Sequence, residues 1–444
     1  RFNKRQMSSM KKQEEQTKNI CLLKKDGFTL YLVKEGDSFT DIKNGVVSIL
    51  PEELIAKRKS GGNISTDIEN YAHKLKRQEY GKKLNYQIEN LLFLTGAGSS
   101  YLFGENDKKG KLMCNLWDDA TVLLGGKQNM DAFCEKVRYT DKDEKDEYRK
   151  NLEKVLSLAE KAKDYITEPI FKTDKEEWNI TYTVSKIKKM IKDNCNLQIT
   201  SSESSSVHEK FLNKITKRKS SIARVKLFTL NYDTLFEQAA RKGNYTIIDG
   251  FSFSIPRIFS GRHFDYDIVI RDGSRIKNED NFVPRVFHLY KPHGSVDWEK
   301  RGNNVYQNKA EEISVEDSLM IFPQENKYEH SYEQPFFEMM TRFQAALRMK
   351  NTTLVVIGFS FGDKHILSMI NEALEQNPSF QLIIINYRDT GIIESDIFYK
   401  EAGERGNIMM VNETFKEFVD AYPNIKIYDQ SDEYRLVKIV NEGN

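Results

Sequence analysis

Small and polar residues come directly after an apolar run near residue 90, and their types are those that bind a phosphate. The run spans residues 91–94, and Gly96, Ala97, Gly98 and Ser99 come after it. Glycines allow close approach of the backbone, and a strand that turns into a helix start presents unpaired N–H groups and the positive end of a dipole. We therefore predict that this junction binds a phosphate or pyrophosphate.

The Gly-Ala-Gly junction on its own is also compatible with an ordinary strand end. The third glycine of the dinucleotide fingerprint is missing, because Tyr101 occupies its position. An ATP-binding P-loop is excluded, since no Lys-Ser or Lys-Thr pair ends the loop. The nucleotide interpretation therefore depends on the residues at the ends of the other apolar runs.

Three further apolar runs end in residues of similar kinds. The runs span 225–230, 354–357 and 382–385, and the residues at their ends are Asn231, Asp233, Gly358, Ser360 and Asn386. In open α/β sheets, ligands bind at the carboxyl ends of the strands. Amide, hydroxyl and carboxylate groups can hydrogen-bond to sugars and amides. We therefore predict that these strand ends meet at one edge and form a nucleotide site.

A histidine stands in a loop bounded by proline and glycine, where a side chain is held out rather than packed in. This residue is His293, between Pro292 and Gly294. Imidazole has an unperturbed pKa of about 6.5, so it can exchange a proton near neutral pH. A purely structural loop histidine is the alternative. Asp233 likewise has a structural alternative, because it is a fair cap for the helix predicted after it.

The elements that must position these residues are short β-branched or aromatic runs with helical patterning nearby. This pattern predicts an α/β fold with a doubly wound, Rossmann-like parallel sheet. Apolar residues between 148 and 166 recur at helical spacing, and we expect that helix face to lie against a core. We predict an N-terminal accessory segment over 1–85 and an α/β domain over 86–444, with a helical insertion at about 105–224.

The composition gives no charge bias and no metal signature. Lys and Arg number 68 against 66 Asp and Glu, a net charge of +2, so neither nucleic acid nor membrane binding is indicated. No apolar run approaches the roughly 18 residues that a membrane helix needs, and we expect a cytoplasmic protein. The four cysteines form no C-x-x-C pair, and no His, Asp or Glu grouping has convincing ligand spacing, so no metal site is expected.

The motifs, taken in order, resemble the sirtuin superfamily. They are Gly-Ala-Gly-x-Ser, Asn-x-Asp, His-Gly, Gly-x-Ser and a strand-final Asn. The closer resemblance is to the sirtuin-like NAD-hydrolysing subunits of bacterial anti-phage systems, notably the kind that partners a HerA-type ATPase. This closer resemblance rests on the segments 229–234, 249–252, 290–295, 326–330 and 358–365.

The resemblance implies an NAD glycohydrolase that converts NAD and water to nicotinamide and ADP-ribose. The resemblance implies that the pyrophosphate is bound by Gly96, Ala97, Gly98 and Ser99, and that phosphate and ribose are contacted by Gly358, Ser360 and Asn386. It implies that Asn231 orients the ribose or the attacking water and that Asp233 contacts the carboxamide. It also implies that His293 is the catalytic base. Cleavage of the nicotinamide–ribose bond develops oxocarbenium-like charge, so positioning and electrostatics should carry most of the rate.

Two departures from the sirtuin deacylases disfavour an acyl-lysine substrate. Deacylases carry a four-cysteine zinc module after the His-Gly segment, whereas no cysteine comes after His293. The residues after Ser100 also lack the Pro-Asp-Phe-Arg run of deacylases. Water therefore remains as the acceptor, NAD is expected as a substrate, and no zinc is expected.

The resemblance also implies a biological setting, which is anti-phage defence by NAD depletion. It implies a homo-oligomer and a HerA-type ATPase as partner. Two alternatives stay open. The chain could be a non-catalytic subunit that senses NAD or ADP-ribose and regulates a defence complex, or a scaffold that uses residues 1–85 and the helical insertion as an interface.

Overall fold

The structure is a computed structural model that describes residues 17–104, 108–172, 177–199, 205–219, 222–270, 282–321 and 334–425. The chain divides into two compact units, each made of segments that are distant in sequence. The first comprises Arg1–Leu92, Lys214–Ala223 and Leu347–Asn444, and the second comprises Phe93–Asn213 and Arg224–Ala346. The segment 326–330, which contributes to the resemblance, lies outside the described residues.

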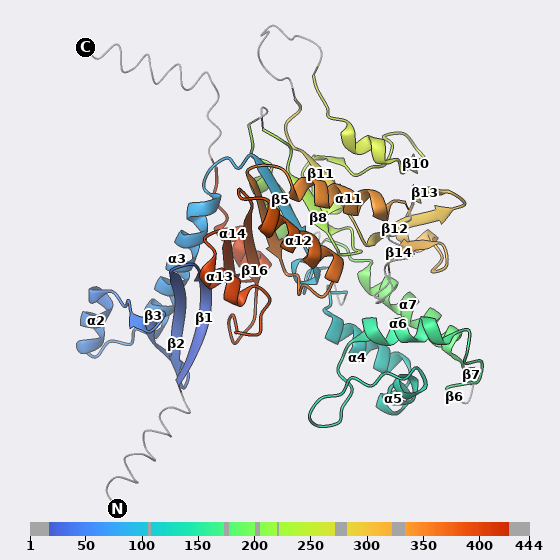
Figure 1. The fold of residues 1–444 in the computed structure, drawn as a ribbon, viewed down its shortest axis with the longest axis horizontal. Coiled ribbons are helices and arrows are strands. Elements are labelled where there is room, and N and C mark those ends of the chain that lie inside the picture. The colour runs from blue at the N-terminus through green and yellow to red at the C-terminus, as the bar shows by residue number, and fades with distance from the viewer. Residues whose placement is uncertain are drawn as a thin grey trace, which may run out of the picture. The chain divides into compact units, whose positions relative to one another are not determined.

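The first unit is built on a mixed sheet of three parallel strands and an antiparallel meander (Figure 1). Its strands, in spatial order, are β4 (Val47–Ser48), β3 (Ser38–Asn44), β2 (Phe28–Glu35), β1 (Thr17–Lys25), β17 (Ile408–Asn412), β16 (Gln381–Asn386) and β15 (Thr352–Ile357). The last three are parallel to one another, whereas β1 pairs antiparallel with β17. The N-terminal segment therefore extends the sheet that carries the residues predicted to contact ribose.

The helices of this unit include one long helix whose buried face is regular. They are α2 (Glu52–Lys59), α3 (Ser65–Leu84), α12 (Lys364–Gln376), α13 (Tyr399–Glu404) and α14 (Phe415–Ala421). In α3 every fourth residue from Ile68 to Leu84 is buried, which is the spacing of one helix face. Lys76 belongs to this face, and its Nζ donates to the carbonyl of Asn412 at 2.8 Å. This bond fixes α3 at the carboxyl end of β17.

The second unit contains the parallel strands β8, β11 and β9, and a separate antiparallel sheet. The parallel strands are β8 (Lys226–Thr229), β11 (Val286–Tyr290) and β9 (Thr246–Ile248), and β5 (Asn90–Thr95) enters this unit next to β8. The antiparallel sheet has the order β10 (Arg257–Ile258), β13 (Asn304–Gln307), β12 (Gly294–Arg301) and β14 (Ser318–Met320). The sequence did not predict this sheet, and β12 begins directly after His293.

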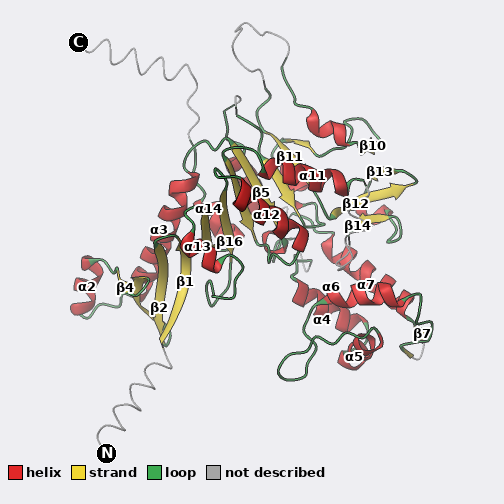
Figure 2. Ribbon diagram, in the orientation of Figure 1, coloured by secondary structure: helices red, strands yellow, loops and turns green. Residues whose placement is uncertain are grey.

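The helices of the insertion are shown in Figure 2, and their buried apolar side chains belong to one hydrophobic core. Helices of the second unit are α4 (Met113–Leu123), α5 (Lys127–Lys136), α6 (Leu152–Ala162), α7 (Ile180–Cys195), α8 (Val207–Ile215), α9 (Leu235–Lys242) and α11 (Phe336–Leu347), and a short hairpin pairs β6 (Phe171–Lys172) with β7 (Glu177–Trp178). The core of α4 to α7 also contains Val296 and Met320 of the antiparallel sheet, and Tyr232 packs against it. The insertion therefore supports the segments next to Asn231 and His293.

The structure confirms the predicted α/β fold with a Rossmann-like parallel sheet. The four predicted strands are present as β5, β8, β15 and β16, and α6 confirms the predicted core-facing helix. None of the helices in the described ranges is long and apolar enough to cross a membrane. The predicted division at residue 85 and the bounds of the insertion stay predictions.

Candidate functional site

The loop after β5 is a 3₁₀ turn, Ala97–Ser99, and the predicted helix start is wrong. The backbone N–H and the hydroxyl of Ser99 both donate to the carbonyl of Gly96, at 3.0 and 2.9 Å. This side-chain bond competes with continued helix formation, and the next α-helix begins only at Met113. A helix dipole therefore does not contribute to anion binding here. The N–H groups of Ala97 and Gly98 have no acceptor among the described residues and remain the donors that an anion can use.

Asn231 joins this loop to the end of β8. Its Nδ2 lies 2.9 Å from the carbonyl oxygen of Gly96, 3.1 Å from Ser99 Oγ and 2.8 Å from Ser100 Oγ. Its Oδ1 has no hydrogen-bond partner in the part of the chain that the structure describes. The amide is thus anchored through nitrogen, and its oxygen is left to accept a hydrogen bond from water or a hydroxyl group.

Both carboxylate oxygens of Asp233 have partners within the unit. Oδ2 accepts a hydrogen bond from the Ser100 hydroxyl at 2.6 Å, and Oδ1 accepts one from the N–H of Leu235 at 3.1 Å. The N-cap of α9 is Thr234, so Asp233 does not occupy the predicted cap position, although its bond to Leu235, the first residue of α9, lies at the start of this helix. A contact with a carboxamide stays a prediction.

The backbone around His293 is fixed by glycine geometry and by the antiparallel sheet. Gly294 has a φ of +86°, and a Cβ on it would lie 2.2 Å from the carbonyl oxygen of Leu319. Only glycine fits this position without movement of the chain. The carbonyl of His293 accepts a hydrogen bond from the N–H of Ile321 at 2.8 Å. His293 is buried, so the expectation that its side chain is held out rather than packed in is wrong. Pro292, directly before it, restricts the backbone of the loop.

A buried lysine fastens the His293 loop to the segment that carries Asn231. Lys291 is 1% exposed. Its ammonium donates to the carbonyl of Asp233, to Ser295 Oγ at 2.8 Å and to Glu237 Oε1 at 2.9 Å. We call Lys291 and these three partners the lysine clamp. The clamp holds the end of β8 against the start of β12.

Tyr232, which belongs to the segment that carries Asn231, also connects this segment to the residues around His293. Its carbonyl accepts hydrogen bonds from the Ser295 hydroxyl at 3.2 Å and from the N–H of Val296 at 3.0 Å. Its phenol donates to the carbonyl of Ile321, the residue whose N–H binds His293. The segments 231–233 and 291–296 therefore lie side by side within the second unit, and the structure brings Asn231 and His293 onto neighbouring segments.

The carboxyl groups of Glu237 and Asp297 both act electrostatically on Lys291, so more negative charge surrounds the lysine clamp than one ammonium neutralises. Burial alone would lower the pKa of Lys291, but Glu237 and Asp297 together raise it above its ordinary value. Burial, with a smaller contribution from Asp297, raises the pKa of Glu237 to about 7 although Lys291 opposes the shift. Glu237 Oε2 and Asp297 Oδ1 have no hydrogen-bond partner among the described residues. Burial therefore favours the protonated form of Glu237 more than that of an exposed carboxyl group.

Asp249, in the segment 249–252, is linked through Arg257 and Gln307 to Asp297. Arg257 forms a two-pronged ion pair with Asp249, with nitrogen–oxygen distances of 2.8 and 3.1 Å. Arg257 also donates to Gln307, and Gln307 donates to Asp297 Oδ2 at 2.7 Å. Burial raises the pKa of Asp249, and Arg257 limits the shift. Asp249 thus anchors the antiparallel sheet.

His208 lies against the loop 96–100, and sequence reasoning missed it. Its ring packs edge-on against Phe103 and Phe236, with ring centroids 5.2 and 5.0 Å away, and it is hydrogen-bonded to the backbone of Ser99. Burial lowers the pKa of His208 to about 4, against the opposing effect of Asp233, so the ring is neutral at pH 7. No motif or spacing in the sequence connects residue 208 with β5.

The other predicted binding residues belong to the first unit, at the carboxyl ends of β15 and β16. Asn386 Oδ1 accepts a hydrogen bond from the N–H of Phe359 at 3.1 Å, and Nδ2 donates to the carbonyl of Phe359 at 2.8 Å. Gly358 supplies the turn with a φ of +61°. Asn386 therefore holds the segment that carries Ser360, and its predicted ribose contact stays a prediction.

Asn412 repeats this arrangement one strand further on. Its Oδ1 accepts a hydrogen bond from the N–H of Arg388 at 2.8 Å, and its Nδ2 donates to the carbonyl of Arg388 at 3.0 Å. Asn386 and Asn412 are direct partners in the register of β16 and β17. Sequence reasoning missed Asn412, although an apolar run that ends in Asn marks it in the same way as Asn386.

A pocket of about 120 Å³ opens at these strand ends, within the first unit. Ser360, Asn386, Arg388, Asp396 and Asn412 are among the residues that line it. Arg388 and Asp396 form an ion pair, with Nη1 and Oδ1 2.8 Å apart. The pocket therefore combines two predicted binding residues with one pair of opposite charges.

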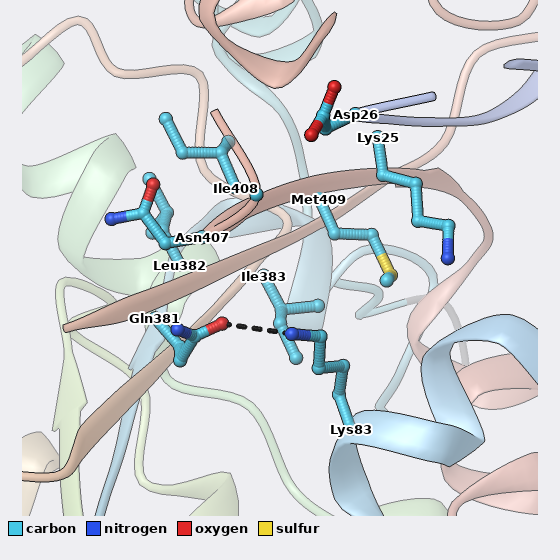
Figure 3. A pocket seen from close by; sticks show the side chains of 10 residues that line it. Lys25, Asp26, Lys83, Gln381, Leu382, Ile383, Asn407, Ile408 and Met409 are labelled. Atoms are coloured by element: carbon cyan, nitrogen blue, oxygen red, sulfur yellow. Dashed lines mark hydrogen bonds between the residues drawn. The ribbon is translucent and has the colours of Figure 1, made fainter. Parts of the chain in front are cut away.

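A second pocket, of about 130 Å³, lies at the amino ends of β16 and β17 (Figure 3). Lys83 donates to Gln381 at 3.2 Å, as Figure 3 shows, and Lys25 pairs with Glu79 at 2.6 Å. Because these polar groups bind one another, and because ligands of parallel sheets bind at the carboxyl ends, we assign this pocket no role.

The described residues contain no group of three or more His, Cys, Asp or Glu that could hold a metal ion. The absence of zinc stays an expectation.

Comparisons with known proteins find one family model that matches part of the chain. Residues 225–403 match the family model of the SIR2-like domain, a range that includes every predicted site residue except the loop 96–99. The match makes an NAD-related activity the expected one. A search of curated proteins finds no significant match. Among solved structures, the chain is similar to cytosolic 5′-nucleotidase IIIB bound to cytidine. The match has 10% sequence identity and a TM-score of 0.27, and it covers 82% of this chain and 91% of that chain. We draw no conclusion about fold or function from a similarity this low.

Proposed function

We propose that this chain, which is SIR2-like over residues 225–403, is an NAD glycohydrolase. The observation that supports this most is the assembly of three distant segments in the second unit. Asn231 binds the loop 96–100 directly, and the lysine clamp holds residues 231–233 beside residues 291–296. These are the segments whose motifs resemble the NAD-binding and base-carrying motifs of sirtuins.

In the proposed reaction, Asn231 positions an oxygen nucleophile or the ribose hydroxyl that orients it. Its Nδ2 is held by the loop, so the direction of Oδ1 is set before NAD arrives. Such preorganisation avoids paying the orientation entropy in the transition state. The N–H groups of Ala97 and Gly98 would face the pyrophosphate, which carries negative charge.

His293 then acts as the base. As the bond between C1′ and the nicotinamide nitrogen breaks, nicotinamide leaves as a neutral amide and positive charge develops on the ribose. Water forms the new bond to C1′, and its proton passes to the His293 imidazole. The products are nicotinamide, ADP-ribose and one proton. General base catalysis of this kind contributes roughly 10²–10⁴-fold to rate.

We further propose, on the resemblance alone, that the activity serves anti-phage defence by NAD depletion. The same resemblance supports a homo-oligomer that associates with a HerA-type ATPase. Light scattering of the purified chain with and without a HerA-type ATPase tests both associations. A monomer in both samples contradicts them.

Nicotinamide release from NAD, measured with the chain alone and with that ATPase, tests the activity. Asn231→Ala removes Oδ1 and the anchor, whereas Asn231→Asp keeps an acceptor oxygen and loses the donor. We expect both variants to lose activity, with the larger loss for alanine. Tight NAD binding by calorimetry with no release in any condition would instead support the non-catalytic sensor.

A further inference from the structure

One face of the parallel sheet in the second unit carries basic side chains that the proposed function does not use. Lys226 and His288 are direct partners in the register of β8 and β11. Phe228 and Tyr290, two residues further along each strand, are also register partners, and their rings stack at 4.3 Å. Since side chains two residues apart in a strand point to the same face, Lys226 and His288 lie side by side on one face of this sheet.

Lys226 brings a cation to this face without a counter-ion. The residue is half-buried, and its ammonium forms no hydrogen bond or ion pair in the described part of the chain. Burial lowers the pKa of Lys226, Arg342 on α11 lowers it further, and no carboxyl group of the described residues opposes the shift. An anion that reaches this half-buried ammonium therefore gains more binding free energy than it would beside a fully exposed lysine.

His288 supplies a second donor. Its Nδ1 lies 3.3 Å from the hydroxyl oxygen of Tyr290. When the phenol donates to Nδ1, the ring proton is on Nε2, which has no hydrogen-bond partner within the described ranges. Burial, and then Lys226, lower the pKa of His288 to about 4, so the ring is neutral at pH 7 beside the ammonium. An anion can therefore accept hydrogen bonds from both side chains.

Arg224 supplies further N–H groups from the chain directly before β8. Its Nε and Nη2 bind the carboxylate of Asp267 at 2.9 to 3.2 Å, and its guanidinium lies over the ring of Phe282, 5.5 Å from the centroid. These contacts fix the side chain, which is 15% exposed. Its Nη1 makes no hydrogen bond to a described residue. Because Arg224 acts electrostatically on His288, these free N–H groups lie near the ring.

Arg342 borders this group of donors from α11, but its own charge is already balanced. Its guanidinium binds Asp265 at 2.8 Å and Glu338 at 2.6 Å, and it lies over the ring of Phe264, 5.2 Å from the centroid. Phe264 in turn stacks on Tyr290 at 4.4 Å. The side chain of Asp265 is 63% exposed, so this border meets solvent. Arg342 therefore contributes a fixed wall and not the donors for a ligand.

We propose that Lys226, His288 and Arg224 form a binding site for a tetrahedral oxyanion, such as a phosphate group, separate from the residues assigned to NAD. The free donors come from three side chains, and a tetrahedral anion presents an oxygen to each of them, whereas a carboxylate has only two oxygens. Hydrogen bonds from charged donors to phosphate are roughly twice as strong as those between neutral groups. Inorganic phosphate and the phosphate group of a larger molecule share this chemistry. The inference stands whether or not the chain cleaves NAD.

The reactivity of the Lys226 amine in the wild-type protein tests the site. Acetic anhydride acetylates neutral amines, and an anion bound beside Lys226 favours the charged form. The protein is treated at pH 8 with sodium sulfate or with sodium chloride at equal ionic strength, and mass spectrometry measures acetylation. Sulfate should slow the reaction of Lys226 by about threefold or more. Lys111 is the matched control, because it is half-buried but already pairs with Asp119, and its rate should be equal in the two salts.

Calorimetry with inorganic phosphate and with glycerol 3-phosphate shows which source of the phosphate group fits the site. Lys226→Met should weaken the tighter of the two by at least about tenfold, whereas Lys111→Met should leave its dissociation constant within about twofold. This difference, together with slower acetylation of wild-type Lys226 in sulfate, upholds the proposal. It is overturned if sulfate and chloride give equal acetylation of Lys226, if Lys226→Met binds both phosphates as the wild type does, or if acetate protects Lys226 as well as sulfate does. Phosphate bound only at the loop 96–100 would give the first two of these results.

Discussion

Replacing Lys291 by methionine removes the cation of the lysine clamp and keeps most of the volume of the side chain. The change leaves the Asp233 carbonyl, Ser295 Oγ and Glu237 Oε1 without their shared donor in a buried site. Removing one partner of a buried ion pair typically costs 3–5 kcal/mol. Glu237 can limit this cost by taking up a proton, because its pKa is already about 7. We therefore expect a loss of about 3 kcal/mol at pH 8 and a smaller loss at pH 5.5.

Urea unfolding at the two pH values measures this loss. Lys83→Met is the matched control, since Lys83 is half-buried and its partner among the described residues is the neutral amide of Gln381. We expect the control to cost less than about 1 kcal/mol. The double variant Lys291→Met, Glu237→Gln should recover part of the loss at pH 8, because it removes the unpaired carboxylate together with its cation.

Nicotinamide release separates positioning from stability. Lys291 holds the segments on which the residues predicted to react lie. The variant, assayed below its unfolding transition, should therefore lose kcat by at least tenfold while KM for NAD changes less. A loss of stability below about 1 kcal/mol together with unchanged kcat would refute the reasoning.

Three further predictions concern the site. Gly294→Ala should cost about 2–3 kcal/mol of stability, because its φ of +86° and the Leu319 carbonyl oxygen at 2.2 Å exclude a Cβ. Gly302→Ala, at a φ of +60° with open space around it, should cost less. Thermal melts compare the two variants, and equal melting temperatures would contradict this expectation. Glu237→Gln should flatten the pH dependence of stability. The raised pKa of Glu237 stabilises the wild type, and this stabilisation is fully present below about pH 4.5 and is lost as the pH rises through about 7. At 1.36 kcal/mol per pH unit, the loss in free energy of unfolding is at most about 3 kcal/mol. Unfolding measured from pH 4.5 to 8 should show this decline only in the wild type. Asn386→Ala should cost about 1–2 kcal/mol, since it removes both bonds to Phe359; urea unfolding measures this loss, and an unchanged free energy of unfolding would contradict it.

The sheet could be predicted because its central strands are continuous apolar runs. Strands such as 354–357 and 382–385 are buried on both faces, so their sequences contain almost no polar residue. Their polar ends could be predicted for the same reason, because a polar residue stands out where such a run stops. Asn412 marks the end of β17 in the same way and was overlooked.

The local geometry of the site could not be predicted, because it depends on residues that are distant in sequence. The loop 96–100 forms a 3₁₀ turn instead of the start of a longer helix. Ser99 bonds back to Gly96, and Asn231, more than a hundred residues later in the sequence, binds both residues. The clamp of Lys291 and the contact of His208 with Ser99 likewise join separate segments. The antiparallel sheet was missed because its strands are short, two of them with three residues or fewer.

The central claim is that the loop 96–100, Asn231 and His293 form one NAD-cleaving site, and His293→Ala tests it most directly. Nicotinamide release and NAD binding are measured side by side for the wild type, for this variant and for His73→Ala, a half-buried histidine of α3 in the first unit. The account predicts that all three bind NAD, that the wild type and His73→Ala release nicotinamide, and that His293→Ala is slower by at least about 100-fold. Equal rates for His293→Ala and the wild type would contradict it.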